Sequence, residues 1–144
     1  MVFQRLRGLV PLMALWMAGM APPISAGERT PEVAGHGKIG LHQISIRAWA
    51  QESGQVGGFV QWQVASVGYP WLMEVTGLWV EGKTARVEAV VVHSPLFPEE
   101  VGEVRYFTVV DRGQGASDPP DELGFGTEPE TWTLPIEGGN FTIR

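Results

Sequence analysis

The 144-residue chain contains no cysteine, which excludes a disulfide framework, a lipid-anchored cysteine and a thiol nucleophile. Without cross-links, an exported domain must obtain its stability from its core. A serine nucleophile has no support either, because no G-x-S-x-G motif occurs and Ser94 beside His93 lacks a third partner. His36, His42 and His93 lack the spacing of a metal site. We therefore expect a protein that is not an enzyme.

Basic residues are also scarce. The formal net charge is −6, and Lys38 and Lys83 are the two lysines. No run of basic residues occurs after Arg7. Such a chain is a poor partner for nucleic acids and for anionic lipid surfaces.

The N-terminus has the pattern of an export signal. Arg5 and Arg7 precede the apolar run Gly8–Met20, which is too short to span a bilayer, since about 18 residues are needed. The motif "APPISA" places a cleavage site between Ala26 and Gly27. We expect a signal peptide over residues 1–26, a flexible leader over 27–37 and a single β domain over 38–144. The mature protein is then secreted or periplasmic, of bacterial origin and without membrane insertion.

The remainder of the chain alternates between apolar and polar residues with the period of β-strands. Gly82 in "VEGKT" predicts a hairpin turn, and the opposite parity of Ile39 and Leu41 predicts a bulge near His42 or Gln43. We expect an all-β fold, an antiparallel sandwich or a small barrel of seven to eight short strands. The expected strands are Ile44–Gln51, Phe59–Val67, Leu72–Val80, Ala85–Val92, Val104–Val110, Leu123–Phe125, Trp132–Leu134 and Phe141–Ile143.

Several marks occur together in a fixed order. They are a Gly-x-Gly-x-Ile start at Gly35, a Gly-Gly pair at Gly57, the central hairpin "VTGLWVEGKTARVEAVVV" and a Phe-x-Val-x-Asp-x-Gly-x-Gly loop beginning at Phe107. In these marks the chain resembles a class of secreted bacterial all-β domains of uncharacterised function. The resemblance implies an all-β exported domain and brings no activity with it. The loop "HSPLFPEEVGE" and the tryptophan-containing "GYPWLME" depart from that pattern.

All three aspartates of the chain, Asp111, Asp118 and Asp121, lie in one loop. Their oxygens suit Ca²⁺, which would be the one candidate cofactor, although the spacing is not that of an EF-hand. Alternatively, aspartate collects here because the chain turns here and a short carboxylate accepts local backbone N–H groups. Turn chemistry is the favoured reading. A catalytic carboxylate pair is disfavoured, because it would need a desolvated cleft rather than a surface loop.

Aromatic residues are the other candidate site. Trp49 and Trp79 fall on strand faces opposite to their apolar neighbours, and Tyr69 and Trp71 lie in one loop. Exposed tryptophans on a sheet suit an extracellular glycan, peptide or protein, whereas Trp62 is expected in the core.

The favoured function is therefore a non-catalytic binding or structural module. A Ca²⁺-stabilised structural domain is the first alternative. A small secreted enzyme or enzyme inhibitor is the second.

Overall fold

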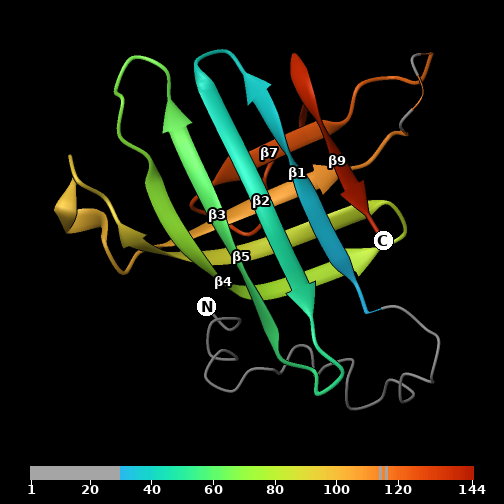
Figure 1. Ribbon diagram of the computed structural model, residues 1–144, viewed down its shortest axis with the longest axis horizontal. Coiled ribbons are helices and arrows are strands. Elements are labelled where there is room, and N and C mark those ends of the chain that lie inside the picture. The colour runs from blue at the N-terminus through green and yellow to red at the C-terminus, as the bar shows by residue number, and fades with distance from the viewer. Residues whose placement is uncertain (1–29, 114, 116) are drawn as a thin grey trace.

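The computed structural model describes residues 30–113, 115 and 117–144, and its regular secondary structure is almost entirely β-strand (Figure 1). A short 3-10 helix, Pro98–Glu100, lies between the fifth and sixth strands. The strands are β1 (Glu32–Ile39), β2 (His42–Ala50), β3 (Val56–Val64), β4 (Trp71–Glu81), β5 (Thr84–His93), β6 (Val104–Val110), β7 (Glu122–Gly126), β8 (Leu134–Pro135) and β9 (Gly138–Ile143). Within the described residues, no helix is long and apolar enough to cross a bilayer.

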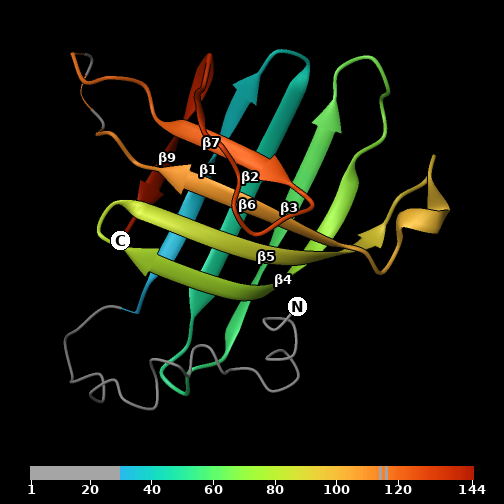
Figure 2. The same ribbon diagram turned by 180° about the vertical axis from the view of Figure 1, so that it is seen from behind.

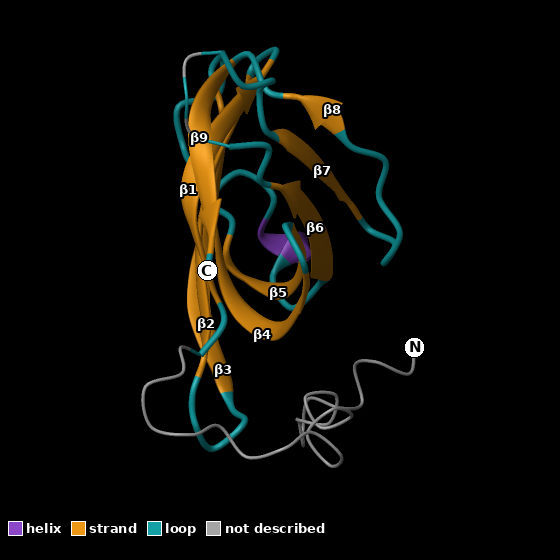
Figure 3. Ribbon diagram, turned by 90° about the vertical axis from the view of Figure 1, so that its right-hand side faces the viewer, coloured by secondary structure: helices purple, strands orange, loops and turns teal. Residues whose placement is uncertain are grey.

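The nine strands form one antiparallel sheet in the order β8-β7-β6-β5-β4-β3-β2-β1-β9. The sheet curls into a half-barrel, so that β9, β1, β2 and β3 face a second layer formed by β4 to β8 (Figures 2 and 3). The all-β antiparallel prediction is confirmed. The number of strands is nine, slightly more than the expected seven to eight.

Strand β4 turns the sheet from one layer into the other. It pairs with β3 only over Trp71–Glu74, whereas its pairs with β5 extend from Leu72 to Glu81. The β4–β5 register shifts between Leu72 and Met73 and again between Val75 and Gly77. Such irregularities bend a strand and increase its twist. The bend therefore explains how one continuous sheet supplies both layers.

The first hairpin corrects two expectations. A turn with Gly40 at φ 59° separates β1 from β2, so the change of parity between Ile39 and Leu41 is a hairpin and not a bulge. Strand β1 begins at Glu32, inside the segment expected as a flexible leader. The expected signal peptide, residues 1–26, lies outside the described residues.

Close packing explains why a glycine-rich segment forms β1 instead of a leader. Val33 is fully buried in the core. A Cβ on Gly35 would lie 2.1 Å from the carbonyl oxygen of Asn140, and one on Gly37 would lie 2.8 Å from the ring of Phe141. The glycines thus let β1 approach β9 closely. The glycine content by itself suggested flexibility, and this is why the sequence predicted a leader here.

The core fills the space between the two layers. Its largest fully buried side chains include Ile44, Met73, Phe107, Leu123 and Phe141. At one end an aromatic group packs against this core: the Trp62 ring lies 4.7 Å from that of Phe125, and its Nε1–H donates to His42 Nδ1 at 3.0 Å. The expected packing role of Trp62 is confirmed, although the side chain is partly buried and packs against the core cluster instead of lying inside it.

Candidate functional site

The outer face of the β4–β5–β6 layer carries an unusual set of side chains. Trp79 of β4 lies opposite Arg86 of β5, and Arg86 lies opposite Thr108 of β6. Side chains of a strand alternate between its two faces. Tyr106, two residues before Thr108, therefore shares this outer face with Trp79 and Arg86.

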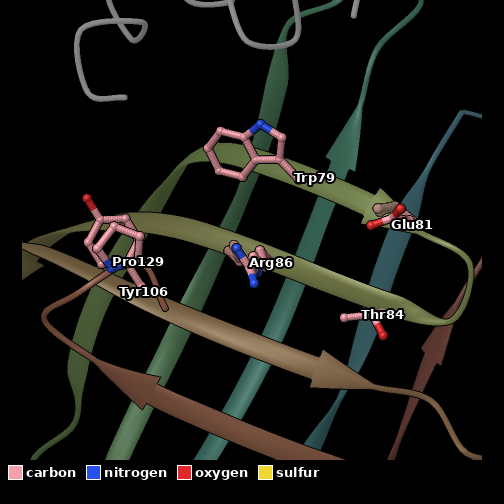
Figure 4. Close-up of a pocket in the computed structure, with 8 residues that line it drawn as sticks. Trp79, Glu81, Thr84, Arg86, Tyr106 and Pro129 are labelled. Atoms are coloured by element: carbon pink, nitrogen blue, oxygen red, sulfur yellow. The ribbon is translucent and has the colours of Figure 1, made fainter. Parts of the chain in front are cut away.

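These residues line a pocket of about 580 Å³. Arg86 lies in the middle of the labelled side chains in the close-up, with Trp79 and Tyr106 around it (Figure 4). The lining residues that the argument uses are Trp79, Glu81, Thr84, Arg86, Tyr106 and Pro129. The pocket thus combines two aromatic rings with one guanidinium, a carboxylate and a hydroxyl, which is the composition of a ligand site with a few polar groups.

The indole of Trp79 is held by packing against β4 and β5. A Cβ on Gly77 would lie 2.6 Å from Trp79 Cη2 and 3.2 Å from the Cβ of Glu88, so the ring covers the space that glycine leaves. Glu88 itself is only 2% exposed, and its Oε1 accepts a hydrogen bond from Thr76 Oγ1 at 2.9 Å. This arrangement gives the pocket a preformed aromatic wall.

Arg86 differs from the other arginines of the described residues. It is exposed, and no described residue forms an ion pair with it, whereas each of the others is paired with a glutamate. The paired arginines are Arg47, Arg105, Arg112 and Arg144. A guanidinium presents five N–H donors in a planar fork that matches a carboxylate. Arg86 is therefore the group of this pocket that suits an anionic ligand.

The connection between β7 and β8 forms a further wall of the pocket through Pro129. Thr131 Oγ1 donates to Thr108 Oγ1 at 2.7 Å, which holds the connection on the sheet. A Cβ on Gly124 would lie 2.2 Å from the carbonyl oxygen of Trp132, so the connection lies directly on β7. The side chain of Trp132 is 92% exposed.

Sequence reasoning missed Arg86, Tyr106 and Trp132 as site residues. Trp132 was expected in a strand, but β8 begins at Leu134. The turn-forming "GTEPET" before Trp132 was the available signal that it lies in a loop. No sequence signal identifies Arg86, because its lack of an ion pair within the described part of the chain depends on where the glutamates lie in space.

The four aromatic residues proposed from the sequence do not form one surface. Trp79 lines the pocket, while Trp49 lies on the outer face of the other layer, where the Arg47 guanidinium is 5.8 Å from its ring centroid. Trp71 stacks on Phe97 with centroids 5.9 Å apart. A binding role for Trp49 and Trp71 stays a prediction.

Tyr69 and Trp71 do not lie in one loop as expected, because Trp71 is the first residue of β4 and pairs with Trp62 of β3. The Trp71 Nε1–H donates to Glu100 Oε1 at 2.9 Å, and the Trp71 ring packs against the core near Trp62. Tyr69, by contrast, is exposed and precedes β4. Tyr69 thus stays a predicted contact residue, whereas Trp71 has an evident packing role.

Two of the three aspartates connect the β6–β7 loop to the edge strand β9. Asp111 and Asp121 are only 5% and 3% exposed. Asp121 Oδ2 accepts from the backbone N–H of Phe141, and Asp111 Oδ2 accepts from that of Ile143 at 3.0 Å. They thereby satisfy outward-facing amides of β9 and join this edge strand to the β6–β7 loop of the other layer.

Asp111 and the third aspartate, Asp118, accept local hydrogen bonds from backbone N–H groups. Asp111 Oδ1 accepts from the N–H of Gly113 at 3.1 Å, and the exposed Asp118 accepts from Gly115 at 2.8 Å. The prediction of turn chemistry is confirmed for both. Within the described part of the chain, no three His, Cys, Asp or Glu side chains gather as a metal site would require. The calcium site over Asp111, Asp118 and Asp121 stays a prediction.

Comparisons with known proteins found no relative. No protein-family model, no curated protein and no solved structure matches this chain. The resemblance to secreted bacterial β-domains stays a prediction, and the geometry of the pocket is the basis for a proposal about function.

Proposed function

We propose that this protein is an exported, non-catalytic binding module, and that its pocket takes a glycan sugar that carries a carboxylate. The observation that supports this most directly is an arginine that forms no ion pair with any other described residue and lines the pocket together with two aromatic rings. Arg86 supplies the cation, and Trp79 and Tyr106 supply the rings.

The chemistry of a uronic acid matches these groups. A pyranose ring has an apolar face of C–H groups, which packs on an indole, and a rim of hydroxyls. Trp79 provides the apolar platform, and Arg86 binds the carboxylate through two parallel N–H donors. Thr84 and Glu81 at the rim of the pocket exchange hydrogen bonds with hydroxyls.

The position of the pocket favours a sugar over an extended peptide. Peptides that bind to sheets commonly add a strand to a free edge, where backbone groups are unpaired. The pocket instead lies on the face of β5, which is paired with β4 on one side and with β6 on the other. A peptide would find no backbone ladder there.

The lining supports binding rather than hydrolysis. Most glycoside hydrolases use two carboxyl groups on either side of the scissile bond. Glu81 is the one carboxylate among the described residues that line the pocket. Export is supported by the basic start and apolar run of the N-terminal segment.

The test uses a single sugar. Methyl glucuronide is titrated into the purified protein while the indole N–H resonances are followed by NMR, and methyl glucoside serves as the neutral counterpart. We expect the acid to shift the Trp79 resonance with millimolar affinity and the neutral sugar to bind at least fivefold more weakly.

A matched pair of variants completes the test. Arg86→Met is expected to abolish the preference for the acid, whereas Arg47→Met on the other layer is expected to retain it. Equal binding of the acidic and the neutral sugar by the unmodified protein would contradict the proposal. So would unchanged binding by Arg86→Met, provided its unfolding midpoint is normal.

A further inference from the structure

The pocket is closed on the side where the sheet continues beyond Arg86. Thr108, the neighbour of Arg86 on β6, is only 6% exposed, and Thr131 Oγ1 donates to its hydroxyl at 2.7 Å. The backbone of the β7–β8 connection lies against Gly124 of β7, and Pro129 of the same connection lines the pocket. The connection therefore covers the outer face of β6 and β7, and a ligand at Arg86 cannot continue across these strands.

Packed side chains close the pocket in the direction away from the β4–β5 hairpin. Glu88 is the next residue of β5 on the outer face after Arg86, and it is only 2% exposed. Tyr106 lies opposite Glu88 on β6. On the β4 side, a Cβ on Gly77 would lie 2.6 Å from Trp79 Cη2 and 3.2 Å from the Cβ of Glu88, so the indole packs beside the glutamate. Side chains buried to this extent leave no accessible surface for a ligand chain along β5.

The opposite end of the pocket, at the hairpin between β4 and β5, is open. Glu81 and Thr84 are the last opposed pair of the two strands, and Glu81 is exposed. In the turn, no atom of the described residues lies within 4 Å of a Cβ added to Gly82, and the side chain of Lys83 is 69% exposed. Figure 4 shows Glu81 and Thr84 at one end of the labelled side chains, with Arg86 between them and the closed end. Along the surface of the sheet, the hairpin is therefore the direction in which a ligand chain can leave.

The linkages of a sugar chain make this shape selective. An internal sugar is linked at C1 and also at a hydroxyl across the ring, such as O4, whereas a terminal sugar is linked on one side only. A pocket that opens in one direction along the sheet has room for one linkage. A free reducing end interconverts between two anomers, while the sugar at the non-reducing end keeps one shape. A preformed pocket therefore suits the non-reducing end, because less ordering is needed on binding.

We propose that the pocket binds the non-reducing terminal sugar of an acidic glycan. This sugar is a uronate whose O4 edge faces the closed end and whose C1 linkage leaves over the β4–β5 hairpin. The inference rests on the proposed function, because it uses the same contact between Arg86 and a carboxylate. The second sugar of the glycan then lies beside Glu81 and Thr84.

The experiment compares two ligands by the NMR titration already described for methyl glucuronide. The disaccharide has glucuronate linked through C1 to N-acetylglucosamine, and the trisaccharide carries one more N-acetylglucosamine on O4 of that glucuronate. The disaccharide is expected to bind with an affinity within about threefold of that of methyl glucuronide. The trisaccharide is expected to bind about tenfold more weakly, because its added sugar meets the wall of the pocket. Equal affinities of the two ligands would overturn the inference.

A third ligand tests the orientation of the chain. In this ligand the glucuronate is a methyl glycoside, and its N-acetylglucosamine is on O4 alone. It is expected to bind as weakly as the trisaccharide. Tighter binding of this ligand than of the disaccharide would show that the chain leaves from O4, and would overturn the assignment of the non-reducing end.

A pair of proline variants tests the wall itself. Pro129→Gly removes a ring that lines the pocket, and it is expected to reduce the difference between disaccharide and trisaccharide from about tenfold to about threefold or less. Pro135→Gly is the control, because Pro135 lies in β8 and does not line the pocket. It is expected to keep the full difference. An unchanged difference in Pro129→Gly, with a normal unfolding midpoint, would overturn the role of the connection.

The outcomes distinguish this inference from the proposed function. If methyl glucuronide binds through Arg86 and the trisaccharide binds equally well, the inference fails and the proposed function stands. If neither methyl glucuronide nor the disaccharide binds, both fail. The comparison of ligands uses the unmodified protein, so it holds whatever the stability of the proline variants.

Discussion

Asp121 and Phe141 are joined by a hydrogen bond of 2.7 Å between a carboxylate oxygen and a backbone N–H, across 20 residues of chain. The other oxygen of Asp121 accepts from the N–H of Arg112 at 2.7 Å. Both oxygens therefore act as acceptors in a buried position. An asparagine has only one acceptor oxygen, and its amide nitrogen would face a second N–H donor. This explains why the position needs a carboxylate.

Replacement of Asp121 by asparagine is expected to destabilise the fold. Hydrogen bonds to charged groups contribute about 1.5–3 kcal/mol, so Asp121→Asn is expected to lower the free energy of unfolding by about 3 kcal/mol. Urea denaturation followed by tryptophan fluorescence measures the change. Asp118→Asn is the matched control, because Asp118 is exposed and its change is expected to cost no more than about 0.5 kcal/mol. Equal losses in the two variants would contradict this assignment.

Calcium is expected to leave the thermal stability unchanged. The oxygens of Asp111 and Asp121 already accept four backbone hydrogen bonds, and Lys83 Nζ lies 3.9 Å from Asp111 Oδ2. Calcium bound at 100 times its Kd would add about 2.7 kcal/mol. Differential scanning calorimetry with calcium and with excess chelator decides the point. An unfolding midpoint several degrees higher with calcium would contradict this expectation and show that the loop binds the ion.

A methyl group on Gly77 is expected to displace the wall of the pocket. The Cβ of Gly77→Ala would lie 2.6 Å from Trp79 Cη2, so the indole must move. We expect methyl glucuronide to bind about tenfold more weakly and the fold to lose about 1 kcal/mol through overpacking. NMR titration and urea denaturation measure the two effects. The control is Gly126→Ala, whose Cβ would make only an ordinary contact of 3.7 Å. Unchanged affinity in Gly77→Ala would show that Trp79 is not the platform.

A methyl group on Gly124 is expected to lift the connection that carries Trp132. Its Cβ would lie 2.2 Å from a backbone oxygen, which cannot yield as a flexible side chain can. Gly124→Ala is therefore expected to lower the free energy of unfolding by about 2 kcal/mol. Gly138→Ala is the comparison, because no atom lies within 4 Å of its added Cβ. Thermal unfolding measures the loss, and equal midpoints of the two variants would argue against this expectation.

Much of the fold could be predicted because strand periodicity is a local property. The alternation over Ala85–Val92 and Val104–Val110 places β5 and β6 almost to the residue. Gly82 adopts φ 61° in the β4–β5 turn. A glycine between two runs of strand-like alternation predicts such a hairpin turn from the sequence. The prediction of a flexible leader from glycine content was wrong at β1, because Gly35 and Gly37 allow close packing against β9.

Only the local hydrogen bonds of the aspartates could be predicted from the sequence. The local acceptors follow from short carboxylates in a turn, as at Asp111 and Gly113. The long-range bonds to Phe141 and Ile143 depend on how far the sheet curls, which no local pattern encodes.

By itself, the sequence determined an all-β antiparallel architecture, the positions of most strands and the turn chemistry of the aspartate loop, because each depends on residues close together in the chain. Tertiary structure decided that the edge strand β9 meets the β6–β7 loop and that one face gathers Trp79, Arg86 and Tyr106. It also decided that Arg86 has no ion pair among the described residues. These features depend on strand order and on the bend of β4, which bring together residues that are distant in the chain.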